Sequence, residues 1–304
     1  MSSKLNRIYV GAIYNRDLEI FREIKNFCSK NYNISIINLL KKGSKSFNAK
    51  YLKKKLKKYP ISLFIVKLYS EKANQNIYNI LRNVAPNIPW LNSFESVSLC
   101  ESRLDTFKLI EQKYNKLQIP KTYSSLDDAF NACANGAVII VKHDTHNIPN
   151  FPKSERIIGI ANSTEELKDL VRVNQKNSLF FQKYLGEFDV IYKVYVIDRW
   201  IVSITSHDRL QENQNLSPLD LIHIRVPVEK KLKRRILRLG RRMGMAIFGV
   251  DYILTNNKTP YIIDVNDFPS FRSIPEAVSL ISDYIYNLTI MQQVRVKTPI
   301  TVQG

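Results

Sequence analysis

The stretch GVDYILTNNKTPYIIDVNDFPSF, from Gly249 to Phe271, decides how this chain is interpreted. Two apolar runs flank a polar turn around Asn257, which is the pattern of a β-hairpin. A loop centred between Asn257 and Lys258 places Asp251 opposite Asp264 on the neighbouring strand. Asp264 and Asn266 are two residues apart, so they point to the same face of the sheet. Three oxygen-bearing side chains are therefore expected to converge on one spot.

Carboxylates in apolar strands need a compensating cation, because burying an unpaired charge is costly. A magnesium ion bound to a nucleotide uses only a few oxygen ligands from the protein, because phosphate and water complete its octahedral shell. We therefore predict that Asp251, Asp264 and Asn266 are metal ligands. The alternative is that the two carboxylates form salt bridges with nearby arginines, but that leaves the apolar frame of both strands unexplained.

Length and composition restrict the class of protein. The chain has 304 residues, of which 44% are hydrophobic, so it can form one large α/β unit or two to three small domains. No run of about 18 apolar residues is present, which argues against a membrane-spanning helix. The N-terminal residues lack the apolar core of a signal peptide. Three cysteines, Cys28, Cys100 and Cys133, are scattered singly, so we expect a reducing, cytoplasmic environment.

The formal net charge of +19 is the strongest global signal and points to an anionic partner. The chain is also rich in Lys, Asn and Ile, a bias that an AT-rich genome produces without any functional purpose. A nucleic-acid-binding protein should interleave aromatic and basic residues on a surface or carry a known motif, and neither is visible. We therefore expect a polyanionic small-molecule substrate, no nucleic acid and no membrane. The oligomeric state stays open, and a monomer is plausible.

The rest of the chain alternates between apolar runs and helical periodicity. Over residues 1–90, short apolar runs alternate with helical segments, which predicts a small open sheet with crossover helices. A helical stretch then ends before Pro120. The run AVIIVKHDT is a predicted strand that carries a single lysine, Lys142, and an apolar strand holds a lysine best when an anion such as phosphate neutralises it. A basic helix is expected at about 228–243 and a final helix at about 275–292.

Taken together, the runs GVDYIL and YIIDVNDFPSF resemble the metal-binding end of the ATP-grasp superfamily. The resemblance implies an α/β fold with an N-terminal open α/β domain (1–92), a central domain (93–182) and a C-terminal domain with the metal site (183–304). It also implies ATP and Mg²⁺ as cofactors. Arg103 and Lys142 match the two basic residues on the phosphate side. In LFFQKYLG, Gln182, Lys183 and Tyr184 match the hinge that meets adenine through backbone groups.

A narrower resemblance, to the inositol 1,3,4-trisphosphate 5/6-kinases, rests on three features. The chain has Asp264-Val-Asn where carboxylate–amine ligases of the superfamily usually have Glu-Val-Asn. It has Lys193, in DVIYKVYVI, where those ligases typically have arginine. The run FIVKLYS matches a kinase segment whose lysine, here Lys67, contacts a substrate phosphate. The segment KHDTHNIPNFPKSE departs from the His-Gly-Thr pattern of these kinases, although His146 is a candidate for their histidine.

The kinase resemblance assigns further roles. It makes Lys193 and His146 catalytic candidates and implies a set of substrate-binding residues: Arg16, Lys67, His146, Lys193, Arg209, Asn266 and Ser270. Each has a simpler alternative. Lys193 can be a lysine that reaches from a strand to solvent, Lys67 can simply end a strand, and Arg209 and His146 can be solvated loop residues.

The sequence therefore predicts an ATP-dependent kinase that transfers the γ-phosphoryl group to a hydroxyl of an inositol phosphate or a similar polyanion. Phosphoryl transfer depends mainly on positioning and charge neutralisation, which the predicted lysines, arginines and metal ligands supply. The alternative within the same fold is a carboxylate–amine ligase, which forms an amide through an acyl phosphate.

Overall fold

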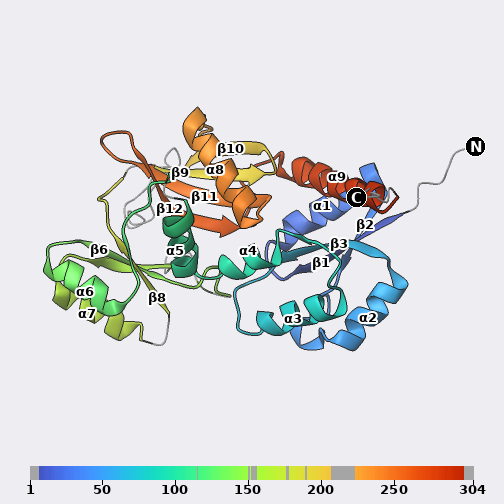
Figure 1. The fold of residues 1–304 in the computed structure, drawn as a ribbon, viewed down its shortest axis with the longest axis horizontal. Coiled ribbons are helices and arrows are strands. Elements are labelled where there is room, and N and C mark those ends of the chain that lie inside the picture. The colour runs from blue at the N-terminus through green and yellow to red at the C-terminus, as the bar shows by residue number, and fades with distance from the viewer. Residues whose placement is uncertain are drawn as a thin grey trace, which may run out of the picture. The chain divides into compact units, whose positions relative to one another are not determined.

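A computed structural model describes residues 7–114, 116–149, 151, 156–175, 178–188, 190–206 and 223–297, with the side chains of 292–297 excluded. The chain divides into two units: one contains the residues up to Phe94 together with Ser270 onward, and the other contains Glu95–Pro269. Each unit is described by itself (Figure 1). The division into domains 1–92, 93–182 and 183–304 stays a prediction.

The N-terminal unit is built on a parallel sheet with the strand order β2-β1-β3-β4. Apolar runs such as FIV in β3 are buried on both faces, as expected when helices cover a parallel sheet. The final helix, α9, belongs to this unit although it comes last in the chain: Tyr286 stacks on Tyr32 of α1 with ring centroids 4.5 Å apart. The elements are β1 (Ile8–Tyr14), α1 (Leu18–Tyr32), β2 (Ile34–Asn38), η1 (Ser44–Ser46), α2 (Ala49–Lys58), β3 (Ile61–Lys67), α3 (Asn74–Val84), β4 (Trp90–Leu91) and α9 (Ala277–Lys297).

The second unit contains two antiparallel sheets, with the orders β5-β8-β6-β7 and β10-β9-β11-β12. The helical stretch predicted before Pro120 is split into α4 and α5, and β5, α6, β7 and α7 had no sequence-based prediction. The elements are α4 (Phe94–Leu99), α5 (Arg103–Lys113), β5 (Thr122–Tyr123), α6 (Leu126–Ala134), β6 (Ile139–His143), β7 (Ile157–Ala161), α7 (Thr164–Val173), β8 (Leu179–Lys183), β9 (Ile191–Ile197), β10 (Trp200–Ser206), α8 (Lys230–Met243), β11 (Ile247–Leu254) and β12 (Pro260–Asp267).

One face of the β10-β9-β11-β12 sheet forms a hydrophobic core. Val194, Val250 and Val265 lie in one row across β9, β11 and β12 and are buried against α8. Val265 lies between Asp264 and Asn266, so strand alternation predicts that it points to the core, and its side chain is fully buried. Helix α8 supplies Ile236 and other apolar side chains to this core while its basic residues stay exposed. Because side chains alternate along a strand, the odd-numbered neighbours in β9 and β11 point to the opposite face, where the polar residues gather.

Among the described residues, no helix combines the length and the apolar character that crossing a bilayer requires.

Candidate active site

Next to the turn, the strands of the β11–β12 hairpin pair one residue away from the register that the sequence predicts, and a β-bulge then restores the predicted pairs. Asp251 pairs with Asp264, and Gly249 pairs with Asn266. Asn266 Nδ2 donates a hydrogen bond to Asp264 Oδ2 at 3.2 Å, so these two side chains share one face as expected. A Cβ on Gly249 would lie only 3.0 Å from the ring of Pro269, which explains a glycine at the centre of this polar face.

Lys193 belongs to the same face as the predicted metal ligands. On β9 it lies directly opposite Asp251, which in turn lies opposite Asp264. Residues directly opposite each other in neighbouring strands point to the same side of a sheet. Lys193 is half-buried, so its role as a substrate contact and the alternative of a lysine that reaches to solvent both stay predictions.

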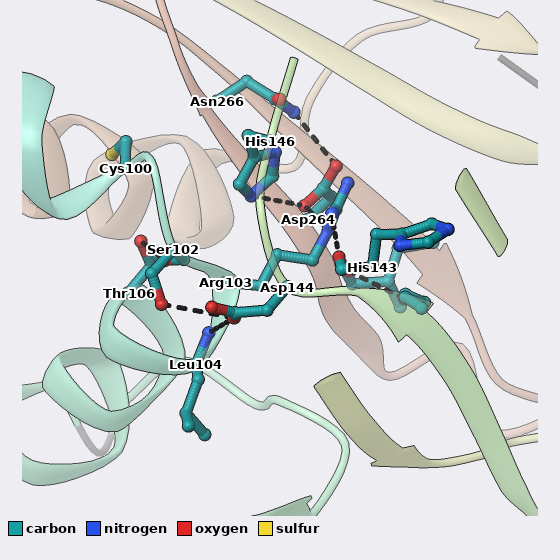
Figure 2. A network of polar contacts seen from close by, with 12 residues as sticks. Cys100, Ser102, Arg103, Leu104, Thr106, His143, Asp144, His146, Asp264 and Asn266 are labelled. Carbon is teal, nitrogen blue, oxygen red and sulfur yellow. Dashed lines mark hydrogen bonds and ion pairs between the residues drawn. The ribbon is translucent and has the colours of Figure 1, made fainter. Parts of the chain in front are cut away.

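Two cationic side chains from distant parts of the chain meet at Asp264 (Figure 2). Arg103, the first residue of α5, places its Nε 3.4 Å from Asp264 Oδ1. His146, in the segment after β6, places its Nε2 3.5 Å from the same oxygen. The guanidinium of Arg103 also donates a hydrogen bond to the carbonyl of His143. Arg103 and His146 are both buried, so neither is the solvated residue that the sequence left as an alternative.

Lys142, a residue of β6, contacts the residue next to Asp264. Its Nζ donates to Gln182 Oε1 at 3.0 Å and to the carbonyl of Ile263 at 3.3 Å. The second contact depends on a β-bulge in β12: Asp251 pairs with Asp264 but Tyr252 pairs with Ile262, so Ile263 is the extra residue. The bulge thus allows one backbone carbonyl of β12 to accept from the lysine instead of from the ladder.

The side chains around Asp264 lower the pKa of its carboxyl group. Burial alone would raise the pKa of Asp264, but the positive charges of Arg103, His146 and Lys142, together with the hydrogen bond from Asn266, hold it well below its usual range. Asp264 is therefore an anion at neutral pH. Its Oδ1 atom is buried and accepts no hydrogen bond within the described part of the chain, so its two neighbours at 3.4 and 3.5 Å act through charge.

The donor set fits a hard cation that also binds phosphate. Within the residues that the structure describes, no three His, Cys, Asp or Glu side chains form a group that could hold a metal ion by themselves. A cation at Asp264 would therefore need Asn266 as a third protein donor, besides Asp251, and the phosphate oxygens of a nucleotide to complete its shell. That combination of few carboxylates with phosphate oxygens is typical of Mg²⁺ sites.

The predicted hinge residues lie on β8 and just after it. The side chain of Gln182 is buried and accepts from Lys142, a contact that the sequence did not reveal. Lys183, the next residue, is exposed. The backbone N–H groups of Lys183 and Tyr184 donate to protein carbonyls, at 2.8 Å each. A contact of these two residues with adenine would therefore use their other backbone groups.

The remaining predicted substrate residues belong to the N-terminal unit or are not described. Lys67 is almost fully buried, and its Nζ lies 3.1 Å from Asp17 Oδ2. Burial would raise the pKa of Asp17, but Lys67, Arg16 and a hydrogen bond from Ser270 lower it overall. The sequence analysis did not predict a role for Asp17, which lies at the N-cap position of α1 but pairs with Lys67 instead of capping the helix. Arg209 lies outside the described residues.

Comparison with known proteins identifies the fold. Residues 200–287 match the model of the inositol 1,3,4-trisphosphate 5/6-kinase ATP-grasp domain, which is less than half of the chain. No curated protein matches.

Solved structures match over nearly the whole chain. The macrocyclase MdnC from Microcystis aeruginosa, bound with precursor peptide MdnA, is 11% identical with a TM-score of 0.63, and the match covers 93% of this chain and 100% of MdnC. An ATP-grasp RimK domain protein from Sphaerobacter thermophilus is 13% identical with a TM-score of 0.63, over 93% and 99% of the two chains. D-alanine–D-alanine ligase from Bacillus anthracis, complexed with ATP, is 14% identical with a TM-score of 0.62, over 96% and 100%.

The chain therefore has the ATP-grasp fold, and the predicted α/β class and resemblance to the ATP-grasp superfamily are confirmed. At these identities the solved structures establish the fold alone.

Proposed function

We propose that this protein is an ATP-dependent ligase, which activates a carboxylate as an acyl phosphate and then joins the acyl group to an amine. The observation that carries the proposal is the state of Asp264. Arg103, Lys142 and, when protonated, His146 lower the pKa of this carboxylate, so it is a good cation ligand and a poor base. An acceptor that brings its own anionic oxygen, as a carboxylate does, needs no base to become a nucleophile.

The proposed roles follow from the contacts. Asp251, Asp264 and Asn266 would hold Mg²⁺, which when bound neutralises charge on the phosphates of ATP. Lys142 and Arg103 would contact the phosphates. Lys193, opposite Asp251, would face the oxygens of the transferred phosphoryl group and offset their charge. All of these residues belong to one unit, so the proposal does not depend on how the two units are placed.

The reaction balances in two steps. A carboxylate oxygen of the acceptor attacks the γ-phosphorus, the bond from that phosphorus to the β–γ bridging oxygen breaks, and ADP leaves. An amine then attacks the acyl carbon, inorganic phosphate leaves with the electron pair of the C–O bond, and the nitrogen releases a proton. The similarity in fold to a macrocyclase bound with its precursor peptide and to D-alanine–D-alanine ligase supports the ligase candidate.

A second candidate, a kinase for a polyanionic hydroxyl compound, is favoured by the match of residues 200–287 to a kinase-named model. The kinase is also favoured by Asp264 and Lys193, which lie where carboxylate–amine ligases of the superfamily usually have glutamate and arginine. A hydroxyl acceptor must lose a proton, and the sequence offers His146 as the base. Its Nε2 atom is directed at Asp264 Oδ1, which supports this role less well than a part in holding charge.

The experiment that separates the two candidates follows the fate of the γ-phosphate. Purified protein is incubated with Mg-ATP and pools of amino acids, peptides and inositol phosphates, with and without hydroxylamine, and ADP, free phosphate and product masses are measured. A ligase releases ADP and phosphate in equal amounts, and hydroxylamine diverts its acyl phosphate to a hydroxamate. ADP release without free phosphate, together with a stable phosphoester of an inositol phosphate, would contradict the ligase and support the kinase.

A further inference from the structure

The carboxylate of Asp144 ties together the segments that bring Arg103 and His146 to Asp264. Asp144 is buried, and it lies in the segment just after β6. Its Oδ1 accepts a hydrogen bond from the backbone N–H of Leu104 at 2.7 Å. The same oxygen accepts from the hydroxyl of Ser102 at 3.2 Å (Figure 2). Both donors belong to the start of α5.

The backbone of Asp144 adds two more contacts. Its carbonyl accepts from the N–H of Arg103 at 3.0 Å, and its own N–H donates to the carbonyl of Ser178, next to β8, at 2.9 Å. On the far side of the same segment, the N–H of His146 donates to the carbonyl of Glu101 at 3.0 Å. The start of α5 and the segment after β6 are therefore joined at several points around one carboxylate.

A carboxylate is well suited to this place. The first N–H groups of a helix lack partners within the helix and carry partial positive charge, so an anion there is stabilised. Ser102 caps α5 through its hydroxyl oxygen, which accepts from Asp105 N at 3.1 Å, while its O–H donates to Asp144. Asp144 takes the neighbouring N–H of Leu104, so the first turn of α5 is fixed beside Arg103.

We infer that Asp144 is a positioning residue for nucleotide binding: it holds Arg103 and His146 on one oxygen of Asp264 without itself contacting the nucleotide. The inference rests on the proposed function only in requiring that Mg-nucleotide binds at Asp264. Residues that orient a functional group through hydrogen bonds typically change affinity or activity by about 10–100-fold when they are lost.

The test measures binding of the fluorescent analogue trinitrophenyl-ATP, with Mg²⁺, to the full chain. Asp144→Ala should weaken binding at least about tenfold. Asp144→Asn keeps an oxygen that accepts from Leu104, so it should lose less than about fivefold, because only the charge interaction with the helix N-terminus is removed. Ser125→Ala is the matched control: Ser125 Oγ caps α6 by accepting from Asp128 N at 3.1 Å, so its loss should lower the melting temperature and leave nucleotide binding unchanged.

A mutant cycle shows whether Asp144 acts through Arg103 and His146. The double variant Arg103→Ala/His146→Ala removes both side chains that Asp144 positions, so it should weaken binding, and Asp144→Ala added to it should weaken binding no further. Additive losses would overturn the inference, as would an Asp144→Ala variant that binds like the wild type. If Asp144→Ala does not fold, an Asp144→Asn variant that folds but binds tenfold or more weakly also overturns it. If the wild-type protein binds no Mg-nucleotide, the proposed function fails together with the inference. That outcome is distinguishable from the others, in which the wild type binds and only the variants decide.

Discussion

Lys67 in the N-terminal unit and Lys142 in the other unit are both buried lysines on apolar strands, but their surroundings differ. Lys67 lies 3.1 Å from the carboxylate of Asp17, so its charge is offset by a direct ion pair. Lys142 donates hydrogen bonds to two neutral oxygens, those of Gln182 and Ile263, and its charge lowers the pKa of Asp264.

Both carboxylates lie among several basic side chains, and the difference is how close these are. Asp17 has a direct ion pair with Lys67 at 3.1 Å and also lies 3.9 Å from Arg272. The two basic neighbours of Asp264 Oδ1 lie further away, at 3.4 and 3.5 Å. We therefore expect changes at Asp17 to act on stability, and changes at Asp264 to act on function as well as on stability.

The largest effect is expected from Asp264→Asn. The substitution keeps the shape of the side chain and removes the charge that would hold a metal ion. Turnover with Mg-ATP should fall by more than the roughly 10–100-fold that is typical for residues supporting a metal ligand, measured at a temperature where the variant stays folded. The melting temperature should fall as well, because buried Arg103 loses its carboxylate. Steady-state kinetics and thermal unfolding of the same preparation measure both. Turnover close to wild type would remove Asp264 from the metal site.

A large effect on stability, without an effect on nucleotide binding, is expected from Asp17→Asn. It leaves the fully buried Nζ of Lys67 without its carboxylate, and breaking a buried ion pair from one side costs about 3–5 kcal/mol of the free energy of unfolding. Binding of Mg-nucleotide should be unchanged at temperatures where the protein stays folded. Denaturant unfolding measures the loss, and the double variant Asp17→Asn/Lys67→Met should recover much of it. An Asp17→Asn protein as stable as wild type would show that the pair is not what stabilises this unit.

The smallest effect concerns pH and follows from the lowered pKa values of both aspartates. A carboxyl group whose pKa is lower in the folded than in the unfolded state stabilises the fold above its unfolded pKa of about 3.9 and loses that contribution as the pH falls through the folded pKa. Neither group should therefore change stability between pH 7 and pH 5. The lowering at Asp264 is the larger of the two, so its contribution should persist to lower pH than that of Asp17.

Unfolding of wild type, Asp17→Asn and Asp264→Asn at a series of pH values from 3 to 7 tests this order. The stability difference between wild type and Asp17→Asn should shrink first as the pH falls. A difference that shrinks between pH 7 and pH 5 for either variant would contradict the lowered pKa values.

The sequence by itself determined the polar face of the β11–β12 hairpin. Side chains alternate with a period of two, so local order was enough to place Asp264 and Asn266 on one face. The strands next to the loop pair one residue away from the predicted register, and the bulge at Ile263 is what brings Asp251 opposite Asp264. The same alternation identified Val265 as core and placed Lys193 on a strand. The motifs around these positions also predicted the ATP-grasp fold.

Only the tertiary structure decided what surrounds Asp264. Arg103 and His146 reach it from segments far away in the chain, and the packing of α5 against the segment after β6 sets their positions, which no local pattern encodes. The bulge at Ile263 interrupts the regular period that sequence arguments assume, so the carbonyl that accepts from Lys142 was not predictable. Contacts between distant segments depend on how whole elements pack, and the burial of Lys67 against Asp17 is decided in the same way.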